Sequence, residues 1–237
     1  MKKRIPLVSV PYAGQSVISS GQECVNLYAE SVAKVDPQAP TPVTYYHTPG
    51  TKLFGQNTEY VFPARGMYRT SRDTAYYVVG QQVYFVGTDG TLTVIGIIAD
   101  RPSRVYMKDN GLVIVLVDGV NGYVIDIVSN AFAQITDPNF LGADFVELLD
   151  TFFIFNRPNT NQFYISVSNA DFTMLSTTGG FDPLDIAAKA GFNDPILWIV
   201  SVHRELWLVG NLTSEVWIGT GAADFYFQQV QGAYINH

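Results

Sequence analysis

After residue 64 the chain alternates between short apolar runs and polar turns. In "TAYYVVGQQVYFVGTDG", residues 74–90, two runs of β-branched and aromatic residues are joined at a glycine and end in a Thr-Asp-Gly turn. "ELWLVGNLTSEVWIGTG", residues 205–221, repeats the pattern with other side chains. Runs of this length, broken by Gly, Asn, Asp and Ser, are typical of β-hairpins. The sequence therefore predicts an all-β fold for this part of the chain.

The hairpins group into units of four apolar runs each, and the units lie near residues 65–98, 103–136, 142–176 and 195–230. The second run of each unit begins at Thr74, Gly111, Thr151 and Glu205, so the spacings are 37, 40 and 54 residues. A period near 40 residues with four strands per unit is typical of β-propeller blades, because a blade buries its faces only against neighbouring blades. We predict a β-propeller over residues 64–237, with about four antiparallel blades and an incomplete ring as one possibility. A β-sandwich or barrel with irregular hairpins is the alternative.

The wider last spacing has a local explanation in "GGFDPLDIAAKAG", residues 179–191. Asp182 can cap a helix, Pro183 suits the first helical position, and Gly191 suits the position after the helix end. We therefore expect a short helix inserted between the third and fourth units. The preceding "NADFTMLS", residues 169–176, is expected to form the last strand of the third unit.

Residues 1–63 are rich in proline and differ from the rest. Proline fixes φ and removes a hydrogen-bond donor, so this part should be an extended N-terminal segment with short strands in "CVNLYAES" and "TYYHTPGTKLF". "VDPQAPTPV" is expected to be an exposed loop. At the other end, "GAYINH" resembles the start of a further strand. We expect the sequence to be the front part of a longer polypeptide; alternatively, residues 1–63 supply the missing strands.

Composition narrows the classes of function. A hydrophobic fraction of 47% and a charged fraction of 15% indicate a folded protein, and the 14% of aromatic residues favours strands. The net charge of −7 argues against a broad phosphate-binding face and against sequence-specific DNA binding.

Cys24 is the only cysteine, which excludes an intramolecular disulfide and a thiolate zinc site. A membrane span is not predicted, because the sequence has no run of 18 apolar residues, and the basic start Met1–Arg4 precedes an apolar stretch too short for a signal peptide.

The histidines do not predict catalysis. His47 adjoins a probable turn, His203 follows a predicted strand and His237 is terminal. The sequence places no second titratable group beside any of them, so structural or solvent-facing roles are expected.

The acidic and amide residues are also explained by turns and caps. "LVDGVNGYVID" offers Asp118, Asn121 and Asp126, but Val117 and Gly119 would occupy ligand positions of an EF-hand loop, so a hairpin turn is predicted there. The possible carboxylate pairs, Glu147 with Asp150 and Asp182 with Asp185, fall at a strand end and a helix start. Asn211 lies in a three-residue glycosylation pattern that fits a turn. Established catalytic and metal motifs are missing, so we predict no enzyme activity and no catalytic, metal or cofactor site.

Tryptophan is concentrated in the fourth unit, at Trp198, Trp207 and Trp217. We expect these side chains to pack between blades, because large aromatic residues dominate cores. The alternative is an exposed aromatic patch for a partner subunit.

The order of several segments resembles one family. "VNLYAES", "YYHTPGTKLFG" and "ARGMYRT…TAYYVVGQQVYFVG" follow one another as in the packaged-DNA stabilisation proteins of short-tailed bacteriophages. The matching positions are Val25-Asn26, Pro49-Gly50, Arg65-Gly66 and Tyr76 to Tyr84. "SRVYMKDNG…VNGYVID" and "WIVSVHRELWLVGNLTSEVWIGTG" resemble later blade strands of that family. The resemblance consists of dispersed matches along nearly all of the chain, and family members are considerably longer.

The resemblance implies a structural virion protein of the head–tail connector or tail hub. Such proteins form a ring, commonly of six copies, beneath the portal and its adaptor ring, retain the packaged genome and offer a seat for the tail needle. DNA would be present only as the contents of the channel, and the acidic balance agrees with weak phosphate contact. The expected location is the virion, and the host cytoplasm during assembly. The alternative function is a β-propeller that binds or acts on glycans; it predicts carboxylates and aromatic residues that converge at a channel mouth, whereas a connector predicts an apolar or charge-patterned flank.

Overall fold

The computed structural model describes residues 27–31, 43–55, 62–191, 193–222 and 224–236. The chain divides into two compact units, residues 1–53 and 54–237. In the first unit, β1 (Leu27–Ser31) pairs antiparallel with β2 (Val43–His47), within the two segments where short strands were predicted. The basic start, Cys24, most of the predicted loop at 35–43 and His237 lie outside the described residues.

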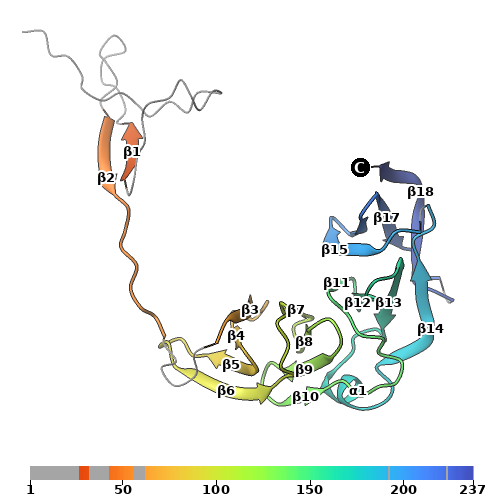
Figure 1. The fold of residues 1–237 in the computed structure, drawn as a ribbon, viewed down its shortest axis with the longest axis horizontal. Coiled ribbons are helices and arrows are strands. Elements are labelled where there is room, and N and C mark those ends of the chain that lie inside the picture. The colour runs from red at the N-terminus through yellow and green to blue at the C-terminus, as the bar shows by residue number, and fades with distance from the viewer. Residues whose placement is uncertain (1–26, 32–42, 56–61, 192, 223, 237) are drawn as a thin grey trace, which may run out of the picture. The chain divides into compact units, whose positions relative to one another are not determined.

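The second unit contains four antiparallel sheets of four strands each, here called the first to fourth blades (Figure 1). The first blade comprises β3 (Ala64–Arg69), β4 (Ala75–Val79), β5 (Gln82–Val86) and β6 (Leu92–Ile97). The second comprises β7 (Tyr106–Asp109), β8 (Val113–Val117), β9 (Gly122–Asp126) and β10 (Phe132–Gln134). The third comprises β11 (Val146–Leu149), β12 (Phe152–Asn156), β13 (Gln162–Ser166) and β14 (Phe181–Ala188). The fourth comprises β15 (Ile196–Val202), β16 (Glu205–Gly210), β17 (Thr213–Gly219) and β18 (Phe227–Asn236).

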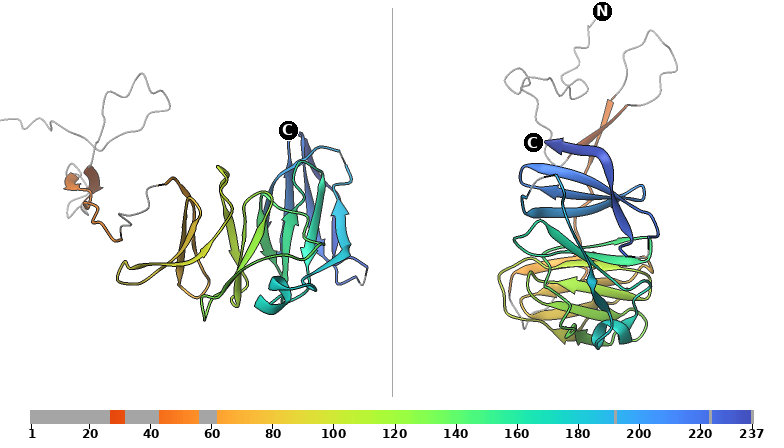
Figure 2. Two further views of the ribbon diagram at one scale, coloured as in Figure 1. Left: turned by 60° about the horizontal axis from the view of Figure 1, so that its bottom comes forward. Right: turned by 90° about the vertical axis from the view of Figure 1, so that its right-hand side faces the viewer.

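Within this unit the blades follow one another face to face along an arc (Figure 2). In every blade the strands pair in chain order. The first strands, β3, β7, β11 and β15, contact one another in succession along the inner side of the arc. This is the arrangement of a β-propeller, so the predicted fold class is confirmed and the sandwich or barrel alternative is wrong.

One apolar cluster fills each of the three blade-to-blade interfaces. The strand β8 shows how the sequence supports two of them at once, because all five of its residues are buried. Ile114 and Leu116 point toward the first blade, whereas Val113 and Val115 point toward the third. A strand buried on both faces reads as a continuous apolar run, as "VIVLV" does.

The segment between the third and fourth blades corrects the sequence prediction. The predicted helix at 182–190 is instead mainly the outer strand β14, and the predicted strand at 169–176 contains the helix α1 (Phe172–Ser176). Asp171 caps α1 by accepting a hydrogen bond from the Met174 amide at 2.8 Å. Pro183 is tolerated in β14 because this strand is at the sheet edge and the β13–β14 register shifts between Tyr164 and Ser166. Pairing with β13 therefore outweighs the local sequence pattern that favours a helix.

Candidate binding surface along the inner strands

An ion pair links the inner strands of the second and third blades. Lys108 on β7 forms an ion pair with Glu147 on β11, and the Glu147 side chain is largely buried. The same carboxylate accepts a hydrogen bond from the Leu148 amide at 2.8 Å. The sequence had placed Glu147 beside Asp150 as a possible carboxylate pair. The structure separates their roles, because Asp150 instead accepts hydrogen bonds from Arg204 at 3.1 Å and from the Tyr226 hydroxyl at 3.0 Å.

An aromatic cluster lies on the inner side of the arc and joins three blades. Tyr106 of the second blade, Phe145 before β11 and Trp198 of the fourth blade contact one another, with ring centroids 4.7 Å (Tyr106–Phe145), 5.3 Å (Tyr106–Trp198) and 4.7 Å (Phe145–Trp198) apart. Trp198 remains 43% exposed. Edge-to-face contacts of this kind stabilise ring pairs beyond their buried area. The cluster therefore holds the inner side together while presenting aromatic surface to solvent.

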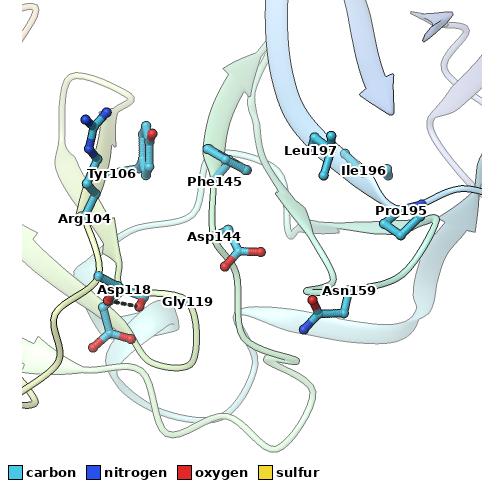
Figure 3. A pocket seen from close by; sticks show the side chains of 11 residues that line it. Arg104, Tyr106, Asp118, Gly119, Asp144, Phe145, Asn159, Pro195, Ile196 and Leu197 are labelled. Atoms are coloured by element: carbon cyan, nitrogen blue, oxygen red, sulfur yellow. Dashed lines mark hydrogen bonds between the residues drawn. The ribbon is translucent and has the colours of Figure 1, made fainter. Parts of the chain in front are cut away.

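A cavity of about 310 Å³ adjoins this cluster (Figure 3). Asp144 and Phe145 lie between Tyr106 on one side and the start of β15 on the other. Asp144 accepts a hydrogen bond from the Asn156 amide through Oδ2, at 3.0 Å, and Oδ1 has no partner among the described residues. Gly119, with a φ of 100°, lies beside that oxygen, and a Cβ there would stand 3.2 Å from it. The cavity thus combines ring faces with one carboxylate oxygen that is available for a ligand.

The other carboxylate that lines this cavity, that of Asp118, already accepts hydrogen bonds on both of its oxygens. Asp118 Oδ1 accepts hydrogen bonds from the amides of Val120 at 3.1 Å and Asn121 at 2.7 Å. Its Oδ2 accepts a hydrogen bond from the Asn121 side chain at 3.3 Å and lies 4.0 Å from Arg101 Nε. Asp118 therefore stabilises the β8–β9 turn, as the sequence predicted, and Asp126 does the same in the next turn through Ser129. Among the described residues, no group of three His, Cys, Asp or Glu could hold a metal ion.

A longer groove, of about 650 Å³, runs from the same aromatic cluster along β3 and β7. Met67 projects into solvent from β3 and is 77% exposed, and Arg104 is also exposed. Arg104 and Tyr106 line both the groove and the cavity, so the two are continuous. The arrangement suits contact with an apolar or ring-shaped group and offers no pair of free carboxylates for acid–base chemistry.

A buried arginine holds the wall between the blades. Arg65 donates hydrogen bonds to the carbonyl oxygens of Gly80 at 2.9 Å, Ala99 at 3.0 Å and Ser103 at 2.8 Å. Burial lowers the pKa of Arg65, although nearby Asp118 partly opposes the shift. Its role is to anchor the β6–β7 loop, which carries Arg104 to the groove.

The connection between the third and fourth blades contains a buried charge network that the sequence analysis missed. Lys189 Nζ donates to Asp194 at 2.7 Å and to the Thr213 carbonyl at 2.8 Å. Asp194 also accepts from the Leu212 amide at 2.8 Å. Burial alone would raise the pKa of Asp194, but these hydrogen bonds prevail and hold it well below its usual range. A sequence pattern could not indicate this network, because its members are separated by up to 24 residues along the chain.

Glu215 extends this network on β17. Its buried carboxylate accepts hydrogen bonds from the amides of Ala190 at 3.1 Å and Gly191 at 2.6 Å, and from Trp217 Nε1 at 3.3 Å. Gly191, predicted to follow a helix, thus belongs to a loop fixed by a carboxylate.

The remaining candidate residues lie in turns or on exposed surfaces. His203 and Arg204 form the β15–β16 turn with φ of 51° and 67°, and His47 is exposed in the first unit. Asn211 lies between β16 and β17, in the predicted turn. The pKa of Asp185 is raised by burial and by the charge of Asp182, but both belong to the edge strand β14 and not to the inner cavity.

The three tryptophans have different positions. Trp217 is 7% exposed and packs edge-on against Phe163 of the third blade, with centroids 5.0 Å apart, which confirms packing between blades. Trp207 is half-buried on the opposite face of the same sheet, where its Nε1 donates to Glu205 at 3.1 Å. Trp198 belongs to the inner aromatic cluster. All three side chains were expected to pack between blades. Trp217 does so, Trp198 contacts rings of two other blades while it remains partly exposed, and Trp207 faces away from the third blade.

A comparison with protein families shows where this blade arrangement belongs. The family described as "Bacteriophage P22 Gp10, beta-propeller" matches residues 25–237. The chain belongs to this phage family. It is a family of phage structural proteins that stabilise packaged DNA, so the suspected family and a virion role are confirmed at that level. No curated protein matches the chain.

Solved structures offer distant likenesses. A catalytically inactive virginiamycin B lyase from Staphylococcus aureus, with quinupristin, is 12% identical, with a TM-score of 0.49, and the match covers 81% of this chain and 60% of that chain. YCF48 bound to D1 peptide is 10% identical, with a TM-score of 0.47 and coverage of 80% of this chain and 58% of that chain. This chain therefore spans less than two thirds of either protein. The described residues include no helix long and apolar enough to cross a membrane.

Proposed function

We propose that this chain is a structural component of a phage head–tail connector or tail hub, which helps to retain packaged DNA through protein–protein contacts. The observation that carries the proposal is the family match over residues 25–237, together with the four blades in the part of the chain that the structure describes. The partners would be the portal or adaptor, the tail needle and sister copies arranged in a ring, a hexamer in the full-length protein. Assembly would take place in the host cytoplasm.

Charge supports a role beside DNA without tight DNA binding. The chain carries 14 Lys and Arg against 21 Asp and Glu. Near the inner strands, Arg65 is bonded to carbonyl oxygens and Lys108 to Glu147, which leaves Arg104 as an exposed cation of the groove. Since DNA affinity depends on cations that neutralise phosphates, we expect the protein to close the channel by shape and partner contacts.

The test uses DNA-filled heads of a short-tailed phage with a nonsense codon in the gene for this chain. We expect these heads to lose their DNA, measured as DNA that becomes sensitive to nuclease, and the purified protein to restore retention when added. Bovine serum albumin at the same concentration is the control for nonspecific protection. Heads that keep their DNA without the protein would contradict the proposal.

A second candidate function is saccharide binding in the inner cavity. It is favoured by the convergence of Tyr106, Phe145 and the available Asp144 Oδ1 around about 310 Å³. Ring faces stack on apolar sugar faces, and carboxylates accept hydrogen bonds from hydroxyl groups. Titration calorimetry with a panel of bacterial surface oligosaccharides tests this candidate. Binding by the wild type that is lost in Asp144→Asn and retained in Asp182→Asn would support it, and the absence of any binding would remove it.

A further inference from the structure

The inner cavity of about 310 Å³ lies at an internal position in the row of blades. Its walls come from the β6–β7 loop, the β8–β9 turn, the residues before β11 and the start of β15. These segments connect or begin strands of the second, third and fourth blades, which pack on one another through apolar clusters. Contacts within this chain therefore fix the shape of the cavity.

A buried asparagine holds the Asp144 side chain in place. Asn156 Oδ1 accepts hydrogen bonds from the amides of Asp144 at 3.0 Å and Phe145 at 2.9 Å, and its Nδ2 donates to Asp144 Oδ2 at 3.0 Å. The other oxygen, Oδ1, has no hydrogen-bond partner in the part of the chain that the structure describes. Figure 3 shows the carboxylate directed into the space between Phe145 and Asn159. Because a carboxylate only accepts hydrogen bonds, a ligand at Oδ1 has to be a donor.

Ring faces form the wall beside this carboxylate. Tyr106 and Phe145 line the cavity, and their ring centroids are 4.7 Å apart. Trp198 packs against both rings from the adjoining groove and holds them in place. The negative face of an aromatic ring attracts cations, and the attraction is larger where water is excluded. Rings next to a carboxylate therefore provide the chemistry that recognises an organic cation.

The charge of the lining also favours a cation. The ionised side chains of the lining are the carboxylates of Asp118 and Asp144 and the guanidinium of Arg104. Figure 3 shows the Arg104 side chain extending away from Asp144. Asp118 has Arg101 Nε 4.0 Å away, whereas Asp144 has no ion pair with any described residue. A neutral hydroxyl group would bond Asp144 Oδ1 but would leave its charge uncompensated.

The single available oxygen distinguishes between the two long cationic side chains. A guanidinium pairs best with both oxygens of a carboxylate, but Asp144 Oδ2 already accepts from Asn156. An ammonium is a compact charge that needs one acceptor here. The methylene stem of a lysine packs along apolar surface, which Leu197 and the two rings offer in this cavity.

We propose that the inner cavity binds the ammonium group of a lysine side chain from a partner protein, with Asp144 Oδ1 as the acceptor and the rings of Tyr106 and Phe145 beside the stem. The inference rests on the proposed function, in which the chain acts through protein–protein contacts. The net charge of −7 makes a basic partner surface complementary to this chain. The saccharide candidate assigns a different ligand to the same cavity, so a sugar is included in the test.

Titration of the purified chain with N-acetyl-lysine-N-methylamide, followed by nuclear magnetic resonance, tests the cation site. We expect shifts of the Gly119, Asp144 and Phe145 amides, and no such shifts with the Nε-acetylated probe, which lacks the charge. Asp144→Asn should weaken binding by roughly tenfold or more, because it removes a charge-assisted hydrogen bond. Asp182→Asn, at an exposed carboxylate of β14, is the matched control and should bind as the wild type does. A wild type whose amides do not shift would overturn the proposal.

A sugar and a second variant complete this test. If methyl glucoside shifts the same amides and the lysine probe does not, the cavity is a sugar site and the proposal is wrong. Circular dichroism checks folding. If Asp144→Asn does not fold, Phe145→Leu replaces it; the loss of one ring face should weaken binding of the lysine probe by roughly threefold. Unchanged affinity in the folded variant would contradict the proposal.

Carbodiimide cross-linking of phage heads with the added protein identifies the source of the lysine. The reagent joins a carboxylate and a neighbouring lysine amine in an amide bond and takes up the water that is lost. Mass spectrometry should find Asp144 joined to a lysine of another virion protein, and heads that received Asp144→Asn should lack this link. Asp144 joined only to other copies of this chain, or left unlinked while other carboxylates react, would overturn the proposal.

The DNA-retention assay separates this inference from the proposed function. Restored retention, without probe binding and without a cross-link at Asp144, would reject the lysine site and keep the function. Probe binding that Asp144→Asn weakens, without restored retention, would keep the cation site and reject the function.

Discussion

At the residue scale, buried charges fix the path of the chain between the third and fourth blades. Lys189 and Asp194 are both buried and satisfied by each other, by the Thr213 carbonyl and by the Leu212 amide. Removing one partner of such a pair leaves an uncompensated charge, which costs more than the intact pair contributes. Two substitutions test this account.

Gly210→Ala should destabilise the fold, because a Cβ at this position would collide with Lys189 Nζ and Asp194 Oδ2. Overpacking of this kind costs about 1–3 kcal/mol. Urea unfolding followed by circular dichroism measures the loss. Gly50→Ala is the control, because a Cβ at that glycine would meet no other atom within 4 Å and its φ is not positive. Wild-type stability in Gly210→Ala would show that the network can move aside.

The pH dependence of stability should change in Asp194→Asn. The folded-state pKa of Asp194 lies below the ordinary value of about 3.9, so its contribution is present above that value and is lost as the pH falls. The free energy of unfolding of the wild type should therefore decrease from about pH 5 downward, and the variant should show a smaller decrease. Asp224→Asn, at an exposed carboxylate, is the control. Equal slopes for the wild type and Asp194→Asn would contradict this assignment.

At the scale of elements, the apolar faces of the blades are buried by contact with neighbouring blades. The pair Trp217 and Phe163 joins the fourth blade to the third, within the third apolar cluster. Pairing within a blade matters as well, because the third blade completes its sheet with the proline-containing strand β14, which pairs with β13.

Trp217→Ala should lower the free energy of unfolding by about 3–5 kcal/mol, because it removes a buried ring and leaves a cavity between two blades. Trp207→Ala should cost less in a monomeric sample, since Trp207 is only half-buried. Thermal and urea unfolding of both variants provide the comparison. Equal losses would mean that the half-buried side chain is packed as tightly as the buried one.

Asp171→Ala tests the correction to the predicted helix. Loss of this N-cap should cost about 1 kcal/mol if α1 begins after Asp171. Asp182→Ala should cost less, because Asp182 lies in a strand and, among the described residues, its side chain accepts one hydrogen bond, from the Leu184 amide at 2.9 Å. A larger loss for Asp182→Ala would favour the helix at 182–190 that the local pattern indicated.

At the scale of the whole molecule, the arc of blades has an interior and two ends. The second and third blades pack on both sides, whereas the first and fourth each pack on one described blade. Hydrogen exchange should therefore be slowest in β8 and β12 and faster in β18, because local opening requires less loss of buried surface at the ends. Mass spectrometry of peptides checks this order at low protein concentration, and uniform protection would contradict it.

Much of the architecture was predictable from sequence. Short apolar runs and turn residues are local properties, so they located the first three strands of every blade and the turns at Asp118 and Asn211. The repeat of about 40 residues indicated the propeller, because blade stacking imposes that period. The exchange of helix and strand at residues 171–188 was not predictable from local capping patterns, since those patterns omit what the neighbouring strand β13 requires.

The sequence by itself determined the strands other than β14, the turns between them, the repeat and the acidic balance, because each depends on neighbouring residues or on composition. Only the tertiary structure decided which side chains meet. It brought Tyr106, Phe145 and Trp198 together from three blades, joined Lys189 to Thr213, and placed Trp207 and Trp217 on opposite faces of one sheet. Those contacts depend on how the blades stack, and the free energy of stacking is a property of paired surfaces that no single segment contains.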